Sequence, residues 1–333
     1  METPLFFNSG IETVELKRGE TLSVFSKDEY ILESLFLSLK EDHASHFAYE
    51  NEENLSSRDI AFMSADGPIF PDLSVYDNLA FSLAKDKKFD ISSTILDMAR
   101  FLNIESLLMK KAKDLSNLEK GKVALGKRFI VNAPLFVCFD PLRKIKELEK
   151  DYVTLVKKKK ARVLFLTSDP KTALLTANTL ITNYGTKDER SGDPLSLYFD
   201  SPTLKTLQSL SIPKVNVIPL EKENGVSMCL GKKISVSSLA SFLAVHPHDI
   251  FLNKSGEYQG AILFLETIGS HRYLHLETHR QEIVVEWSGG DVKIGERLNF
   301  DIPLTKSYLF LENGERVRTR NDKISNSLIG GLK

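Results

Sequence analysis

Two short and almost continuously apolar runs constrain the fold of this chain more than any other feature. They are Pro134–Phe139 and Val163–Thr167. A strand with one face in solvent alternates apolar and polar residues, whereas a strand covered on both faces is apolar throughout. Both runs therefore predict buried strands of a mostly parallel sheet with helices on its two sides. The first domain is predicted to be α/β.

The N-terminal part of the chain supplies further elements for such a sheet. Gly10–Lys17 alternates as a half-buried strand does, and a second strand is expected at Thr21–Phe25 after a turn. Tyr30–Leu39 then carries the wide apolar stripe of a helix, and the pattern of Asp90–Lys113 is also helical. Strand, turn and helix in this order are the scaffold of a phosphate-binding loop.

The character of the sequence changes near Lys214. Short alternating segments separated by Gly, Pro, Asn and Asp follow, namely Ala261–Leu265, Tyr273–Glu277 and Ile283–Trp287. This spacing is typical of a small β-rich barrel. We therefore expect two domains, an α/β domain over residues 1–212 and a β domain over residues 213–333.

Composition excludes several classes of function. The length of 333 residues leaves room for two domains, and a net charge of -1 gives no attraction to nucleic acid or anionic lipid. Cys138 and Cys229 lie far apart in apolar surroundings, so neither a disulfide framework nor a zinc site is expected. The start Met1–Pro4 does not resemble a signal peptide, and no apolar run reaches the roughly 18 residues of a spanning helix. We expect a cytoplasmic protein with no nucleic-acid partner, which meets a membrane only through other subunits.

One segment resembles a known family without a gap. Ile60–Phe81 reads IAFMSADGPIFPDLSVYDNLAF. It is similar to IAMVFQSYALFPHLTVYDNIAFGL in the ATPase subunits of ATP-binding-cassette sugar importers of the maltose and glycerol-3-phosphate type. In that family the Gln of the segment touches the metal and the attacking water. The corresponding position here is Ala65.

The family's phosphate loop, GPSGCGKST, has a counterpart without glycine. In that loop the backbone N–H groups surround the phosphates and the Lys neutralises them. The counterpart here is Ser26–Ser34, with Leu32 at the Lys position and Glu33 at the position of the metal-binding hydroxyl. Asp28 and Glu29 would face a triphosphate with like charge, at about 1 to 4 kcal/mol each. The resemblance therefore implies a phosphate loop that has lost its function.

The family's signature helix, LSGGQRQRVAIARAL, corresponds to Leu115–Phe129. Ser116 keeps its place and suits a helix N-cap, whereas Asn117, Leu118 and Glu119 replace the two glycines and the glutamine. In the family this helix start meets the nucleotide held by the opposite subunit. Ser116 is therefore the residue that the resemblance implies for binding ATP in trans, and a helix cap is the alternative.

The catalytic strand LLLDEPLSNLD corresponds to Phe136–Leu142, which retains one carboxylate, Asp140. Counted from the signature, Asp140 falls on the catalytic Glu. Aligned on Pro134, it falls on the metal-binding Asp. The switch His of the family's VTHD motif is replaced by Ser168.

Two further regions extend the resemblance along the chain. Ser191–Pro202 is similar to VGTPLELYHRPAN, which leads out of the family's ATPase domain. Val245–Leu252 and Leu265–Leu274 echo VRPEHI and VEPLGSETYL of its C-terminal OB-like (TOBE) regulatory domain. The implied fold is a nucleotide-binding domain of mixed sheet with a helical subdomain at about residues 77–125, followed by an OB-like barrel.

The resemblance also implies a docking wall for the transmembrane permease. In the family, a groove beside the Gln-bearing loop receives a short permease helix. An apolar set stands at the corresponding place here: Phe70, Pro71, Leu73, Val75, Tyr76 and Leu79. The alternative is that these residues only hold the helical subdomain together.

Taken together, the residues predict a subunit of a carbohydrate importer with little or no ATP hydrolysis of its own. No cofactor is expected, and ATP with magnesium would bind only at a site shared with an intact partner. The expected partners are permease subunits at the inner face of the cell membrane, and a second copy or an intact ATPase in a dimer. Two alternatives stay open, a drifted but active importer ATPase and a regulatory binding module outside transport.

Three histidines recur at every fourth residue: His271, His275 and His279. The spacing invites a metal site, but no Cys or carboxylate pattern completes one. We interpret them as a solvated strand face.

Overall fold

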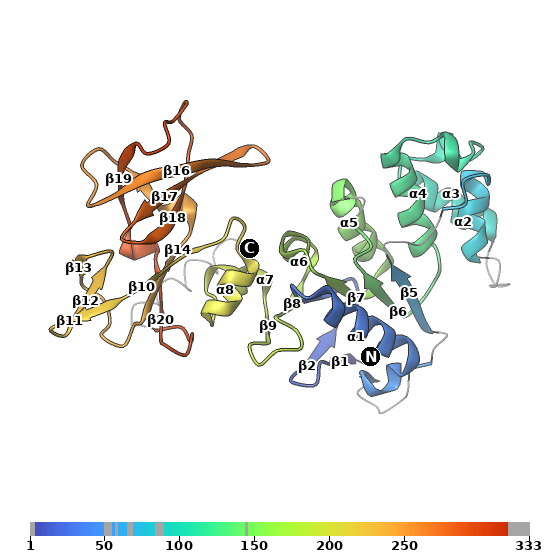
Figure 1. Ribbon diagram of the computed structural model, residues 1–333. Helices are drawn as coiled ribbons and strands as arrows, with labels where there is room; N and C mark the ends of the chain where they lie inside the picture. Colours follow the sequence, from blue (N-terminus) through green and yellow to red (C-terminus); the bar gives the residue numbers. More distant parts are fainter. Residues whose placement is uncertain are drawn as a thin grey trace. The chain divides into compact units, whose positions relative to one another are not determined.

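The computed structural model describes residues 4–49, 55–56, 59–64, 69–83, 90–143 and 146–318. The chain divides into two compact units, Met1–Ser196 and Leu197–Lys333 (Figure 1). The division lies ahead of the boundary that composition placed after residue 212. None of the described helices combines the length and apolar character that crossing a bilayer requires.

A six-stranded sheet in the order β5-β6-β7-β3-β8-β9 forms the centre of the first unit. Neighbouring strands run parallel except β8 and β9, which pair antiparallel. The two apolar runs are the adjacent strands β6 and β7, and both are buried along almost their whole length. The bounds are β3 (Thr21–Phe25), β5 (Ile60–Ser64), β6 (Leu135–Phe139), β7 (Arg162–Thr167), β8 (Thr179–Thr182) and β9 (Arg190–Gly192).

Separate hydrophobic cores cover the two faces of this sheet. On one face, helix α1 (Glu29–Glu41) and a small antiparallel sheet in the order β2-β1-β4 pack against Val24, Val137 and Leu164. The other face packs on a core that includes side chains of α5. The prediction of a mostly parallel sheet buried on both sides is confirmed. The remaining bounds are β1 (Leu5–Asn8), β2 (Thr13–Leu16), β4 (Phe47–Tyr49), α5 (Glu149–Lys159) and α6 (Pro170–Thr176).

Helices α2 (Val75–Leu83), α3 (Ile91–Phe101) and α4 (Asn117–Phe129) pack together in this unit. The expectation of one helical segment from Asp90 to Lys113 is wrong at its C-terminal end. Asn103 adopts a left-handed conformation with φ 54°, which ends α3, and short 3-10 turns follow. The apolar spacing continued past Asn103 because those turns also face the core.

The second unit is built mainly of antiparallel strands. A curled five-stranded sheet has the order β15-β19-β16-β17-β18, and its inner residues form one core with those of shorter strands. The predicted order of an α/β domain followed by a β-rich OB-like domain is confirmed. The sheet strands are β15 (Phe251–Leu252), β16 (Tyr258–Ile268), β17 (His271–Thr278), β18 (Gln281–Glu286) and β19 (Arg297–Asp301).

Two three-stranded sheets and a helix complete the second unit. Helix α8 places Leu207 against Val215, Ala244 and Phe310, which explains why residues ahead of 212 belong to this unit. Helix α7 (Pro194–Phe199) contains the division between the units. The sheets have the orders β10-β14-β20 and β11-β12-β13. Their bounds are α8 (Leu204–Leu210), β10 (Asn216–Pro219), β11 (Glu221–Glu223), β12 (Val226–Cys229), β13 (Lys232–Ile234), β14 (Phe242–Val245) and β20 (Tyr308–Phe310).

Candidate functional site

The strands that carry the predicted motifs end together at one edge of the central sheet. The parallel register aligns Ser64 with Phe139 and Phe139 with Leu166, and it aligns Phe25 with Thr167. Open α/β sheets bind ligands at this carboxyl edge. The loops after β3, β6 and β7 therefore form the candidate site. Ala65, which follows β5, lies outside the described residues.

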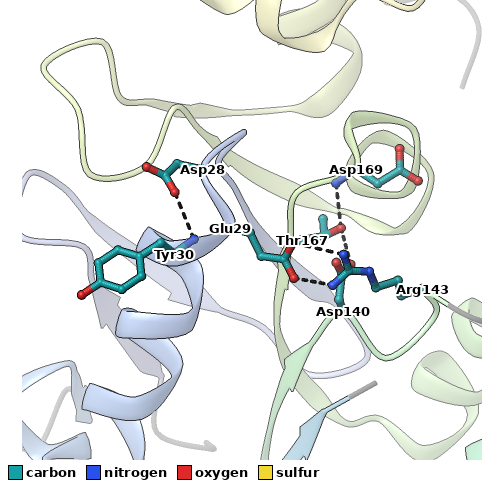
Figure 2. A network of polar contacts seen from close by, with 7 residues as sticks. All are labelled: Asp28, Glu29, Tyr30, Asp140, Arg143, Thr167 and Asp169. Carbon is teal, nitrogen blue, oxygen red and sulfur yellow. Dashed lines mark hydrogen bonds and ion pairs between the residues drawn. The ribbon is translucent and has the colours of Figure 1, made fainter. Parts of the chain in front are cut away.

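The loop after β3 is short and is closed by its own side chains. It consists of Ser26–Asp28, and α1 begins at Glu29. The Asp28 carboxylate caps α1 by accepting a hydrogen bond from the Tyr30 N–H at 3.0 Å, and the Ser26 hydroxyl accepts one from the Asp28 N–H at 3.3 Å. A helix N-terminus attracts anions through its free N–H groups. Here a carboxylate of the chain itself already occupies that position (Figure 2).

Leu32, which stands at the position of the family's lysine, points into the core from the start of α1. Leu32 is 0% exposed and belongs to the core that includes Leu35 and Phe36. Glu33, at the position of the metal-binding hydroxyl, is exposed. The helical period explains the difference, since neighbouring residues on a helix point about 100° apart. A side chain at position 32 serves the core and does not reach the edge.

Asp140 directly follows β6 and is held in one place. It has a left-handed backbone with φ 44°, is 5% exposed, and accepts a hydrogen bond from the Thr167 hydroxyl at 2.6 Å (Figure 2). Burial raises the pKa of Asp140, while the bond from Thr167 and the charge of Arg143 oppose that shift. Ser168 follows Thr167 at the end of β7. The structure thus brings the ends of β6 and β7 together, because the two strands pair in parallel.

An ion pair that sequence reasoning missed spans the edge. Arg143 forms a two-point contact with Glu29, with 3.1 Å between Nη2 and Oε2, and so links the segment after β6 to the start of α1 (Figure 2). Both side chains are about half exposed. The sequence did contain an indication of this ion pair, because the two opposite charges follow strands whose carboxyl ends meet at the same edge. It was not recognised, since the family's motif has no counterpart of Arg143.

The acidic groups at the described part of this edge are all engaged within the chain. Asp28 caps α1, Glu29 pairs with Arg143, and Asp140 binds Thr167. Asp169 caps α6 and accepts a hydrogen bond from the Thr172 hydroxyl at 2.8 Å. Each of these carboxylates is therefore already bonded to another group of the chain.

Ser116 begins α4 in a reciprocal capping box. Its hydroxyl accepts a hydrogen bond from the Glu119 N–H at 3.3 Å, and the Glu119 carboxylate accepts one from the Ser116 N–H at 2.8 Å. The backbone bond and the hydroxyl of Ser116 lower the pKa of Glu119. The expectation that Ser116 is an N-cap is confirmed. Glu119 replaces the family's glutamine and supplies the second half of the box.

The predicted docking wall is only partly a surface. Val75 and Leu79 are 0% exposed and belong to the core, so their assignment to a partner-facing wall is corrected. Their spacing of four residues places both on the buried stripe of α2. The other members keep some exposure: Phe70 and Tyr76 are half-buried, and Pro71 and Leu73 are exposed.

A buried asparagine and an aromatic pair shape this wall. Asn78 is 0% exposed, and its amide accepts a hydrogen bond from the Phe70 N–H at 2.8 Å and donates to the Phe70 carbonyl at 3.0 Å. Phe70 meets the exposed Phe81 edge to face at 4.6 Å between centroids, and the Lys127 ammonium lies 3.9 Å from the centre of the Phe70 ring. A cavity of about 300 Å³ is lined by residues of β5, α2 and α4, including Phe62, Ser82 and Lys127. Phe81 and Lys127 lie in the two motif segments Ile60–Phe81 and Leu115–Phe129, but their contacts with Phe70 join residues distant in sequence, so the motifs did not indicate them.

The three spaced histidines are not one solvated face. His275 is 8% exposed, with Nδ1 2.5 Å from a Glu282 carboxylate oxygen and Nε2 3.0 Å from one of Glu266. His271 is exposed and pairs with Glu286, whereas His279 lies in the turn after β17. The error arose because neighbouring strands supply the glutamates. No group of three or more His, Cys, Asp or Glu side chains in the described ranges is arranged to hold a metal ion.

The sequence is similar to proteins of known importers over most of its length. It is 28% identical over 279 residues to the sn-glycerol-3-phosphate import ATP-binding protein of Psychromonas ingrahamii, covering 77% of this chain and 74% of that protein. It is 24% identical to the maltose/maltodextrin import ATP-binding protein of Vibrio vulnificus, covering 82% of each chain. The alpha-glucoside transport ATP-binding protein of Rhizobium meliloti is 24% identical, covering 80% of this chain and 81% of that protein. No family model matches the sequence.

Among solved structures, the chain is similar to cbiO1 from Clostridium perfringens, part of an ABC transporter complex. The TM-score is 0.48 at 16% identity, covering 59% of this chain and 91% of that one.

Proposed function

We propose that this chain is a subunit of a carbohydrate-type importer that does not hydrolyse ATP at its own sheet edge. It acts there as a structural or regulatory partner of permease subunits at the cytoplasmic face of the membrane. The similarity to ATP-binding proteins named for the import or transport of glycerol 3-phosphate, alpha-glucosides and maltose supports the class of assembly. The loss of hydrolysis rests on the geometry of the edge.

The observation that carries this proposal is the closed loop after β3. Binding a triphosphate there requires free N–H groups and a cation aimed at the phosphates. Asp28 instead accepts from the Tyr30 N–H of α1, and Leu32 is buried where the family has its lysine. Glu29 and Arg143 neutralise each other across the remaining space. A magnesium nucleotide would have to break this network and meet the repulsion of two carboxylates.

We expect the purified chain to show no measurable affinity for ATP or ADP with magnesium. Isothermal titration calorimetry on the full chain checks this, with an intact importer ATPase as the positive control. Glu29→Gln is an informative second variant, since it removes one repulsive charge and the ion pair but restores neither glycines nor lysine. It should also fail to bind. A micromolar dissociation constant for the wild-type chain would overturn the proposal.

In a head-to-tail pair with an intact ATPase, Ser116 and Asp140 of this chain would serve different nucleotide sites. The partner's nucleotide would meet Ser116 of this chain, whose hydroxyl and helix start contribute about 1 to 3 kcal/mol. Ser116→Ala should then lower the ATPase rate of the pair about tenfold. Glu119→Ala breaks the same capping box without removing the hydroxyl and is the matched control. If Asp140→Asn abolished activity while Ser116→Ala left it intact, this chain would be hydrolysing ATP at its own site.

We further propose that the exposed part of the wall binds a short helix of the permease. Leu73 and Phe81 are 39% and 58% exposed, beside the cation and ring contacts of Phe70 and Lys127. Exposed apolar side chains favour a partner surface.

Leu73→Glu together with Phe81→Glu should abolish co-purification with the permease subunits. Both side chains are exposed, so the melting temperature should change little. Phe70 and Tyr76 are less suitable for this test because they are half-buried. Met109→Glu, at a residue 86% exposed in the same unit, is the control that should leave co-purification intact. A large loss of stability in the double variant would assign these residues to the core instead.

A further inference from the structure

Two hairpin turns of the second unit meet tip to tip. Leu230 and Gly231 join β12 to β13, and His279 and Arg280 join β17 to β18. All four residues have positive φ, from 45° to 74°. The His279 ring lies against Gly231 so closely that a Cβ there would be 2.6 Å from its Cε1 atom. The glycine is therefore required for the contact between the turns.

The turn of β17 and β18 uses residues that are costly in this conformation. Two-residue turns with positive φ favour Asn-Gly, because other side chains lose about 1 to 2 kcal/mol each in the left-handed region. His279 and Arg280 have φ of 45° and 61°. A strained turn of this kind is often kept for the side chains that it presents.

These turns border a hollow of about 470 Å³ with strands β16 and β19. Its base is apolar, with Leu230 and Tyr258 each 5% exposed. Its rim carries the cationic side chains of Lys232, Arg280 and Arg297. The volume lies within the range of small-molecule sites.

The cations on the rim are not neutralised by the chain. Within the described residues, no ion pair joins Lys232, Arg280 or Arg297 to an acidic side chain, although Glu257 and Glu277 line the same hollow. Three cations face two carboxylates, and His279 adds a further polar ring. The hollow therefore attracts anions.

One of the arginines is oriented in advance. Arg297 donates from Nη1 to the Gln259 amide oxygen at 3.1 Å, and Gln259 donates in turn to Asn299 at 3.0 Å. A guanidinium fixed at one nitrogen keeps its remaining N–H groups for a phosphate or carboxylate.

We propose that this hollow binds a monosaccharide phosphate. Arg280, Arg297 and Lys232 suit the phosphate, and the carboxylates of Glu257 and Glu277 suit the sugar hydroxyls. The apolar base formed by Leu230 and Tyr258 suits the C–H face of a sugar ring. An acidic peptide would place like charge beside both glutamates. A sugar would place neutral hydroxyls there, so a sugar phosphate is the more favourable ligand. The site lies wholly in the second unit and does not depend on what the sheet edge of the first unit does.

Calorimetry with glucose 6-phosphate on the full chain tests the proposal. We expect binding of the sugar phosphate and none of glucose at the same concentration. Arg280→Gln and Arg297→Gln should each weaken binding about tenfold or more, because each removes a charge-assisted hydrogen bond. Lys293→Gln removes the same charge from an exposed residue outside the hollow and should leave the affinity unchanged.

Trp287 fluorescence during urea unfolding shows whether each variant keeps the fold of this unit. Equal binding of glucose and its phosphate would overturn the proposal. It would also fail if inorganic phosphate bound as tightly as the ester, or if neither arginine variant changed the affinity. Failure to bind either glucose 6-phosphate or ribose 5-phosphate would likewise overturn it. None of these outcomes bears on ATP binding by the first unit.

Discussion

Replacing Leu32 by lysine is expected to lower the free energy of unfolding of the first unit by about 3 to 5 kcal/mol. It is also expected to create no nucleotide affinity. Leu32 is 0% exposed beside Leu35 and Phe36, so the variant loses apolar packing and forces an ammonium group into the core. Burial would favour the neutral amine, which could not attract phosphate.

Glu33→Lys is the matched control, because it places the same side chain on the next and exposed position of α1. Its cost should stay within about 0.5 kcal/mol. Urea unfolding followed by far-ultraviolet circular dichroism compares the two variants, and calorimetry with ATP and magnesium follows. A Leu32→Lys protein as stable as the wild type that bound ATP would show that α1 can turn this position toward the sheet edge. The proposal of a closed loop would then be wrong.

The second unit is expected to lose stability in mild acid through one histidine. His246 is 2% exposed, its Nε2 has no hydrogen-bond partner, and its ring stacks between Tyr198 and His248 at 5.3 and 5.2 Å. The pKa of His246 is lowered from 6.5 to about 4, mainly by burial and also by the charge of His248, while Asp249 opposes the shift. The native unit therefore holds this ring neutral.

The direction of the effect follows from proton binding. Between pH 6.5 and 4 the unfolded chain binds a proton at His246 that the native unit does not, so stability falls as the pH falls through that window. The full loss is about 3 kcal/mol, and about 2 kcal/mol of it should be reached at pH 5.

Urea unfolding followed by the fluorescence of Trp287, the single tryptophan of the sequence, measures this loss at pH 7 and pH 5. His246→Phe keeps an aromatic ring in the stack but cannot be protonated, so most of the difference between the two pH values should disappear. His271→Gln is the control, because the side chain of His271 is 60% exposed, and the pH dependence should remain. An unchanged dependence in His246→Phe would show that another group is responsible.

Local patterns were sufficient where a feature depends on residues close together in the chain. The apolar runs identified β6 and β7, because a strand buried on both faces must be apolar throughout. Ser116 was recognised as a cap, since its capping-box bonds reach only three residues along the chain, to Glu119. Asp140 and Ser168 directly follow these two runs, and the parallel register sets the two strand ends side by side.

The sequence was insufficient where contacts join distant segments. Glu29 and Arg143 meet only because β3 and β6 end at the same edge, and His275 is buried only because two other strands supply its glutamates. The resemblance placed Val75 and Leu79 in the docking wall, and only the packing of α2 shows that both are buried.

The sequence by itself determined that an α/β domain precedes a β-rich domain and that Ser26–Ser34 contains no glycine. Only the tertiary structure decided that Asp28 and Arg143 close that edge and that two hairpin turns gather cations around a hollow. The physical reason is that backbone preferences and hydrophobic period act over a few residues. Charge pairing and burial depend instead on which strands the fold brings side by side.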